Sequence, residues 1–320
     1  PYYRRRGEPP TTYSTTTRTY FLRRVVTHLR NAGESGDPAL FIPLATGLLV
    51  AFDDDLDEPA KTSTVSYEYD WETRRTTIVT RWYPRYSHCL GFLWLLRGAG
   101  DALELNRLKT GWRFLAGRDG EQTGREEPYV DLWDQAPDAV MHLLRHARSM
   151  EVQQFALRVW QANPGFLDEA DCAFISDLLT SWFPGTVALG LELARAKWDP
   201  AAPDLKLLLA MLDSALDEAR GQGSEWLAEV LPTLAVDGDF LAAVAFLKHE
   251  DARAAVREAL RSSPLSKELR AEVVARVISG LLSLDDEATA GAATDWLEFI
   301  GPDELTALPD AHLVSLSAHV

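Results

Sequence analysis

The chain has 320 residues, 46% of them hydrophobic and 25% charged, so it can bury a core of ordinary size. Its net charge of −16 disfavours a general nucleic-acid binder, because phosphate contacts need a densely basic surface. No apolar run reaches the roughly 18 residues of a membrane span, and two distant cysteines give no disulfide framework, so we expect a cytoplasmic protein that does not enter the membrane.

The segment over positions 1–15 combines Pro, Thr and Ser with three consecutive arginines and predicts a flexible basic arm. Residues 1–30 hold seven arginines and one acid, so the remainder of the chain carries a net charge of −22. Arginine beside tyrosine can grip phosphate and stack on bases. The candidate contacts to nucleic acid or to a partner are Arg4, Arg5, Arg6, Arg18, Arg23 and Arg24. The alternative is a solvated arm that docks on the chain's own acidic surface.

Two helices are expected after the arm. Apolar spacing predicts the first from Thr17 to Ala32, with Gly33 as its C-terminal cap. The second begins at "DPALF", where Asp37 can cap the helix and Pro38 suits its first turn.

Residues 64–83 alternate in polarity and are rich in β-branched and aromatic residues, which predicts an inserted β-hairpin. Two strands alone are only marginally stable, so this hairpin should lean on the helices. Helices near 86–97 and 101–115 and a polar loop over 116–130 are expected next. Together these segments form a predicted N-terminal helical region, residues 16–130.

From residue 131 to 320 a pattern recurs in which a small residue at the centre of a helix is flanked, four positions away on each side, by apolar or small residues. The five copies are Val152, Ala156, Trp160; Thr186, Gly190, Ala194; Ala219, Gly223, Leu227; Ala252, Val256, Leu260; and Ala288, Ala292, Trp296. The first positions of successive copies are nearly evenly spaced along the chain, and another helical stretch precedes each copy. We interpret these residues as the core of stacked helix pairs, because a unit of about 34 residues cannot bury its own apolar stripe. Chance spacing in a helix-rich protein is the alternative.

The segments "LLRHARSMEVQQFALRVW" (143–160) and "FLKHEDARAAVREALRS" (246–262) resemble the turn and second helix of HEAT-like and armadillo-like repeats. The resemblance covers residues 131–320 and implies an all-α fold, a HEAT-like α-solenoid with a concave binding surface. It implies no activity.

The segments "RTYFLRRVVTHLRNAG" and "EPYVDLWDQAPDAVMHLLRHARSM" are also similar to the helical region of large bacterial proteins that carry a WGR domain. The WGR domain itself is not in this sequence, so no residue of it can be carried over. Because the sequence begins with Pro1, we interpret it as a piece of a longer bacterial chain.

Metal sites are not expected. His142 and His146 are spaced to share a metal, but no third ligand is evident. Asp53, Asp55 and Asp57 alternate as in a calcium loop, yet the glycine and glutamate required at its sixth and twelfth positions are missing. A solvated helix end explains this acidic run better.

Catalytic residues and cofactors are not expected either. Cys89 follows His88, but neighbours in a helix point about 100° apart, and Cys172 lies on an apolar face. No phosphate-binding loop or nucleophile elbow is present. An enzyme on a helical-repeat frame, such as a DNA glycosylase, would need a basic groove that the acidic body does not suggest.

Two interpretations remain. The leading one is a non-catalytic scaffold whose concave acidic surface binds a protein or peptide, with exposed tryptophans as interface anchors. The alternative is a DNA-associated module of a bacterial repair or phage-defence protein that uses the basic arm.

Overall fold

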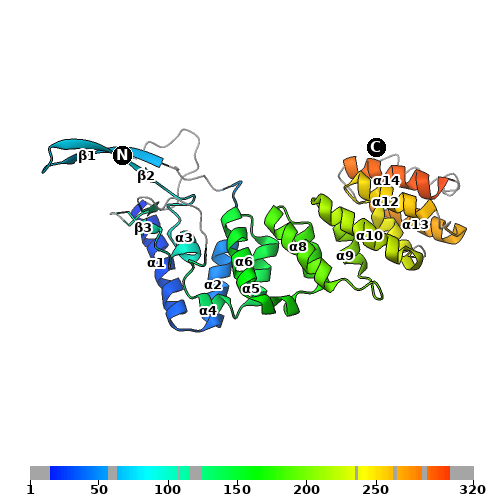
Figure 1. Ribbon diagram of the computed structural model, residues 1–320, viewed down its shortest axis with the longest axis horizontal. Coiled ribbons are helices and arrows are strands. Elements are labelled where there is room, and N and C mark those ends of the chain that lie inside the picture. The colour runs from blue at the N-terminus through cyan, green and yellow to red at the C-terminus, as the bar shows by residue number, and fades with distance from the viewer. Residues whose placement is uncertain are drawn as a thin grey trace. The chain divides into compact units, whose positions relative to one another are not determined.

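The computed structural model describes residues 15–56, 63–106, 109–115, 124–234, 237–261, 265–282 and 287–302. These residues are mostly helical and include two small antiparallel hairpins (Figure 1). The chain divides into two compact units, unit 1 (residues 1–169) and unit 2 (residues 170–320). Except for its last residue, the predicted arm over residues 1–15 lies outside the described part.

Unit 1 begins with two neighbouring helices, α1 (Thr15–Glu34) and α2 (Pro38–Val50). The Asp37 carboxylate accepts a hydrogen bond from the Ala39 N–H at 2.9 Å, and proline occupies the first turn of α2. Both features agree with the prediction, because an aspartate cap satisfies one of the exposed N–H groups at a helix start.

The prediction that Gly33 ends the first helix is wrong. Gly33 lies inside α1, where a side chain would overlap the ring of Tyr129, so glycine permits close packing there. Gly36 instead has the left-handed conformation, with φ +68°, in the turn between α1 and α2.

The predicted hairpin is confirmed, but the expectation that it leans on the helices is not, because β2 packs mainly on β1 and on the segment Trp112–Phe114. Strand β1 (Ser63–Asp70) pairs antiparallel with β2 (Arg75–Trp82), and it projects from the helices of unit 1 (Figure 1). In the turn, the Asp70 carboxylate accepts hydrogen bonds from the Thr73 hydroxyl at 2.7 Å and the Glu72 N–H at 2.8 Å. The bond from Thr73 is the main reason that the pKa of Asp70 is lowered.

The helix predicted near 101–115 is wrong, because a second hairpin occupies this segment. Strand β3 (Leu103–Leu105) pairs antiparallel with β4 (Trp112–Phe114). The Asn106 side chain accepts a hydrogen bond from the Thr110 N–H at 2.9 Å, and Lys109 adopts φ +53°. This asparagine-led turn reverses the chain before a helix can form.

The core of unit 1 is an aromatic cluster around Trp133, which is fully buried. The ring centroids of Phe155 and Phe41 lie 5.0 and 6.0 Å away, each edge-on to Trp133. Edge-on rings are a favourable arrangement beyond their apolar burial. The helices that complete unit 1 are α3 (Leu90–Arg97), α4 (Val130–Trp133), α5 (Pro137–His146), α6 (Met150–Ala162) and the 3₁₀ helix η1 (Pro164–Glu169).

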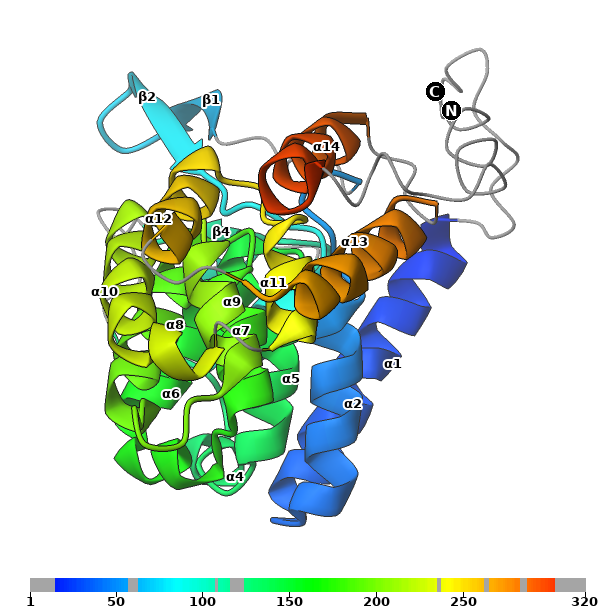
Figure 2. The same cartoon turned by 90° about the vertical axis from the view of Figure 1, so that its right-hand side faces the viewer.

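Unit 2 consists of helices in the part that the structure describes. In chain order they are α7 (Cys172–Leu179), α8 (Pro184–Lys197), α9 (Leu205–Leu212), α10 (Asp217–Leu234), α11 (Gly238–Val244), α12 (Glu250–Arg261), α13 (Lys267–Leu281) and α14 (Glu287–Ile300). Helix α7 packs on α8 and α9, α9 on α10 and α11, and α13 on α11 and α14 (Figure 1 and Figure 2). Helix α10 also packs on α12.

Three helices of unit 2 begin with the same cap. The evenly spaced residues Asp171, Asp204 and Asp237 precede α7, α9 and α11. Each carboxylate accepts a hydrogen bond from the N–H three residues later, at 2.7, 2.9 and 2.9 Å. The same local interaction therefore starts α7, α9 and α11.

Two glycines bring α8 against α7 and α10 against α9 in the same way. A Cβ atom on Gly190 of α8 would lie 3.0 Å from Leu178 Cβ of α7. A Cβ atom on Gly223 of α10 would lie 3.0 Å from Met211 Cβ of α9. The two glycines, and the two residues they touch, are separated by the same interval as successive aspartate caps.

The structure places the five predicted copies on α6, α8, α10, α12 and α14. In the first four, every residue of the pattern is buried. In the fifth, Trp296 is fully buried but Ala292 is only half-buried, while the neighbouring Ala293 is fully buried. Ala288 also lies in α14. At the centre of the fifth copy, the fully buried residue is thus Ala293 and not the predicted Ala292.

Candidate functional site

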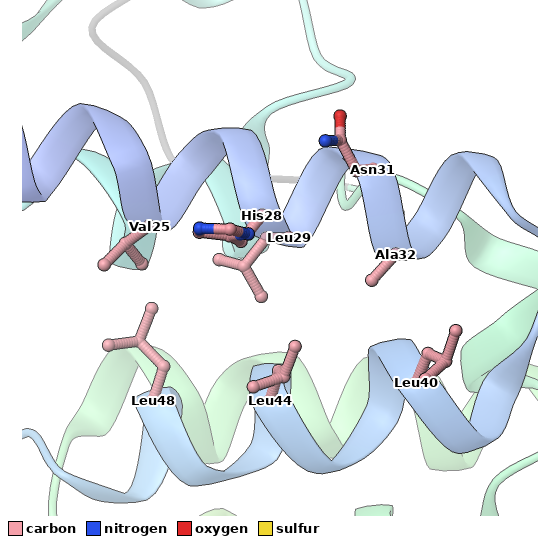
Figure 3. A pocket seen from close by; sticks show the side chains of 8 residues that line it. All are labelled: Val25, His28, Leu29, Asn31, Ala32, Leu40, Leu44 and Leu48. Carbon is pink, nitrogen blue, oxygen red and sulfur yellow. The ribbon is translucent and has the colours of Figure 1, made fainter.

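An apolar groove of about 690 Å³ lies between α1 and α2. Three side chains of α1 face three side chains of α2 across it (Figure 3). The lining residues are Val25, Leu29 and Ala32 on α1, and Leu48, Leu44 and Leu40 on α2, with His28 and Asn31 as the polar members. The groove is therefore apolar along its length.

The groove exists because α2 is apolar on two faces. Its sequence, "PALFIPLATGLLV", contains no charged residue. Phe41, Ala45 and Leu49 are buried, whereas Leu40 and Leu44 on the groove side are 54% and 53% exposed. Leucines four residues apart on one face are the usual mark of a helix that packs against a partner.

The charge beside the groove is positive. Helix α1 carries four arginines, and its only acid is its last residue, Glu34. Arg23 donates a hydrogen bond to the Lys109 carbonyl at 3.3 Å. Arg24 is exposed and lies one helical turn before His28, a spacing that places it at the rim of the groove.

The hairpin forms a second exposed apolar surface in unit 1. Val65, Tyr67 and Tyr69 alternate along β1, and Tyr67 pairs with Ile78 of β2, so these side chains share one face. All four are exposed, and Trp71 at the turn lies edge-on to Tyr69 with ring centroids 4.8 Å apart. The charges of the hairpin suggest no particular partner for this face.

Asp54 organises a polar junction inside unit 1. Its carboxylate accepts hydrogen bonds from Arg85 at 3.0 Å, from the Tyr86 hydroxyl, and from the Met150 N–H at the start of α6 at 2.8 Å. The interpretation of the acidic run as a solvated helix end is therefore wrong for Asp54, and Asp53 pairs with Arg148. Burial and the Asp54 carboxylate raise the pKa of Tyr86, which keeps its phenol protonated.

A buried ion network ties residues 124–134 to the helices of unit 1. Arg97 donates to Glu126 at 2.8 Å, and Arg125 pairs with both Glu127 and Asp134. Glu127 is 1% exposed. None of these groups lines the groove, so the network positions chain segments rather than forming an open reaction site.

Unit 2 carries most of the net charge of the chain. It contains 25 acidic and 11 basic residues, a net charge of −14, whereas unit 1 has 23 acidic and 21 basic residues, a net charge of −2. Arg195 of α8 pairs with Glu218 of α10, and Arg220 of α10 pairs with Asp251 of α12, each at 2.8 Å. These two ion pairs connect α10 with α8 and α12.

The exposed side of α10 is acidic along its length. Glu218, Glu225 and Glu229 follow at i, i+7 and i+11, so they lie on one side of the helix. All three are exposed. We call this side of α10 the acidic face.

The arginines predicted as contacts are only partly described. Arg4, Arg5 and Arg6 lie outside the described residues. Arg18, Arg23 and Arg24 all belong to α1, and the last two are exposed.

The histidines and cysteines form no metal or catalytic centre among the described residues. His142 and His146 lie with ring centroids 4.5 Å apart, but the described chain holds no group of three potential metal ligands. Burial, followed by the nearby His146 and Arg145, lowers the pKa of His142. Cys89 and Cys172 are unbridged and half-buried, and burial and the Asp204 carboxylate raise the pKa of the Cys172 thiol. A raised pKa opposes thiolate formation.

Most tryptophans of the predicted helix pairs are buried. Trp160, Trp226 and Trp296 belong to the core, and Trp198 stacks on Trp226 with ring centroids 4.4 Å apart. Trp182, at 55% exposure, is the candidate interface anchor among them.

Sequence reasoning missed the groove. The signal available was the absence of charge in α2, since a surface helix normally carries polar residues on its outer side. The sequence predicts a helix here without assigning its leucines to a surface, and only the packing of α2 shows that it has a second apolar side.

None of the described helices combines the length and apolarity that a membrane span requires. No protein-family model matches the chain, and neither the curated proteins nor the solved structures compared with it show significant similarity.

Proposed function

We propose that the protein is an interaction scaffold whose helix pairs stack as HEAT-like repeats and present an acidic surface to a basic partner segment. The caps at Asp171, Asp204 and Asp237 and the contacts of Gly190 and Gly223 recur at one constant interval along the chain. Identical contacts at a fixed interval are what stacked helix-pair repeats require, because each pair buries its apolar stripe against the next.

The observation that carries the proposal is the acidic face of unit 2. It is formed by Glu218, Glu225 and Glu229 of α10, and ion pairs from Arg195 to Glu218 and from Arg220 to Asp251 connect α10 with α8 and α12. A surface of one sign attracts a partner of the opposite sign and speeds its association. A lysine- and arginine-rich segment is the complementary partner.

A charge reversal tests this function. A short fluorescein-labelled peptide of lysine, arginine and alanine is titrated with the protein, and binding is followed by fluorescence anisotropy at low and moderate salt. Glu229→Lys is expected to weaken binding about threefold, because exposed charge pairs contribute little individually. Glu268→Lys, on the exposed side of α13, makes the same change in net charge and is the matched control. Equal effects of the two substitutions, or no binding at low salt, would contradict the proposal.

DNA association is the second candidate, and exposed Arg23 and Arg24 beside exposed Tyr20 and Phe21 on α1 favour it. Arginine and aromatic side chains together can hold phosphates and bases. The test is a mobility-shift titration of the full chain with duplex DNA at low and moderate salt. A mobility shift of the DNA that is lost in the double variant Arg23→Glu, Arg24→Glu would support DNA association. The absence of any shift at low salt would contradict it.

A further inference from the structure

We propose that the groove between α1 and α2 docks an acidic amphipathic helix of a partner protein. This binding site is separate from the acidic face of unit 2 and calls for a partner of the opposite charge.

The shape of the groove matches a short helical stripe. Val25, Leu29 and Ala32 are spaced i, i+4 and i+7 on α1, opposite Leu48, Leu44 and Leu40 on α2 (Figure 3). The eight-residue step from Leu40 to Leu48 extends about 12 Å, or roughly two helical turns. A partner helix with apolar side chains at i, i+4 and i+7 covers the same length.

Gly91 of α3 lies against the Val25 and Leu48 end of the groove. A Cβ atom there would lie 3.1 Å from Leu48 Cδ2 and 3.3 Å from Val25 Cγ1. The glycine therefore allows α3 to reach the first pair of lining side chains. The exposed leucines, Leu40 and Leu44, follow toward the other end of the groove.

The groove favours a helical occupant over an extended one. Its walls are two α-helices, whose interior N–H and C=O groups are already paired within each helix. An extended peptide would bring its own unpaired backbone groups against apolar walls, which is costly. A helix satisfies these groups internally and presents only side chains.

Charge selects an acidic helix. The walls contribute no carboxylate: α2 is uncharged, and α1 has arginines throughout and a single acid at its end. Arg24 at the rim attracts Asp or Glu beside the apolar stripe of a partner, and it repels a basic helix.

The described part of a second copy of the chain offers no equivalent helix. Its large exposed apolar side chains lie on α1, α2, the hairpins and isolated positions such as Met150 and Trp182. None of these side chains forms a stripe on an acidic helix. We therefore assign the groove to a different protein, and the test below includes a second copy as an outcome.

A display selection tests the occupant directly. Random peptides of helix-forming length are selected on the immobilised full chain, with counter-selection on the Leu44→Glu variant. We expect the selected peptides to carry apolar residues at helical spacing and a net negative charge. The proposal is overturned if the enriched peptides are basic or lack apolar residues at helical spacing. It is also overturned if no enriched peptide loses binding to the Leu44→Glu variant.

Binding of the enriched peptide to variants of the protein then shows whether the peptide occupies the groove. Leu44→Glu places a charge in the groove and Ala32→Trp fills it without charge, and each should weaken binding at least tenfold. Arg24→Glu should weaken it about fivefold and reduce its salt dependence. Leu56→Glu is the matched control, because Leu56 is 82% exposed outside the groove, and its effect should stay within twofold.

Two further measurements separate the alternatives. Circular dichroism melts establish that each variant folds, which is expected because Leu40 and Leu44 are already exposed. Size-exclusion chromatography shows whether the chain self-associates. If it does, and Leu44→Glu abolishes this self-association, the occupant of the groove is a second copy of the chain and the proposal is overturned. Glu229→Lys should leave the groove peptide unaffected, so the acidic face and the groove can fail independently.

Discussion

Unit 1 and unit 2 are both mostly helical, but different interactions hold their helices together. Unit 1 joins distant segments through individual contacts, such as the ring cluster around Trp133 and the Asp54 carboxylate that reaches Arg85 and the start of α6. Unit 2 uses the same few contacts again at equal steps along the chain, as at the Asp171, Asp204 and Asp237 caps.

This difference predicts how each unit responds to a substitution that removes one of its contacts. A contact that occurs once in unit 1 has no substitute, so its loss should affect the whole unit. A contact that recurs in unit 2 involves neighbouring helices, so its loss should act mainly on one helix pair and the next. The four predictions below test this contrast, beginning with the largest effect.

Trp133→Ala should lower the free energy of unfolding of unit 1 by about 3–5 kcal/mol, the usual cost of removing a large buried aromatic side chain. Denaturant unfolding followed by circular dichroism measures the loss. Hydrogen exchange with mass spectrometry should place faster exchange across α2, α5 and α6. Trp182→Ala is the control, because this tryptophan is exposed and lies in unit 2. Faster exchange confined to α4 would show that unit 1 is less interdependent than its ring contacts indicate.

Gly223→Leu should destabilise unit 2 by about 1–3 kcal/mol, because the new side chain would be forced against Met211 of α9. Gly221→Leu in the same helix is the control, since a Cβ atom there meets nothing within 4 Å. It should stabilise α10 by about 0.5–1 kcal/mol through its greater helix propensity. Thermal unfolding of both variants measures the difference, and a Gly223 variant as stable as the parent would remove the close-packing argument.

Asp204→Ala should cost about 1 kcal/mol, because the Leu207 N–H loses its cap at the start of α9. Hydrogen exchange should quicken at that helix end while the starts of α7 and α11 keep their protection. Asp204→Asn is the conservative control and should retain most of the stability. Equal losses for the two substitutions would assign the effect to charge rather than to capping.

The smallest effect concerns pH and unit 1. Burial raises the pKa of Glu151 above its ordinary value of 4.5, although Arg97 opposes this. The folded protein therefore keeps this proton at a pH where the unfolded chain has lost it, so stability falls as the pH rises above 4.5. Glu151→Gln should remove that part of the decline, leaving the variant relatively more stable near neutral pH than in acid. Urea unfolding across this range measures the effect, and a pH-independent difference would contradict it.

The regular elements of the fold could be predicted from the sequence more accurately than the irregular ones. Asp37 with Pro38 predicted the start of α2, and alternation over 64–83 predicted the hairpin, because caps and strand alternation are encoded by near neighbours. Residues 101–115 were misread as a helix. Their turn depends on Asn106 bonding to Thr110, which the apolar spacing does not reveal.

The candidate groove was predictable only in part. The missing charge in "PALFIPLATGLLV" is visible in the sequence, and so is the arginine-rich α1. Which leucines are buried was not visible. Phe41 and Leu49 face the interior, whereas Leu40 and Leu44 face α1 across the groove and remain exposed.

The sequence by itself determined the helical character, the even spacing of the capping aspartates and the separation of a basic start from an acidic remainder. These properties depend on residue type and on interactions within one or two helical turns. Tertiary structure alone decided that Asp54 forms a junction inside unit 1 and that the side of α2 carrying Leu44 lines a groove. Both outcomes depend on which distant segments meet, and spacing along a chain does not specify that.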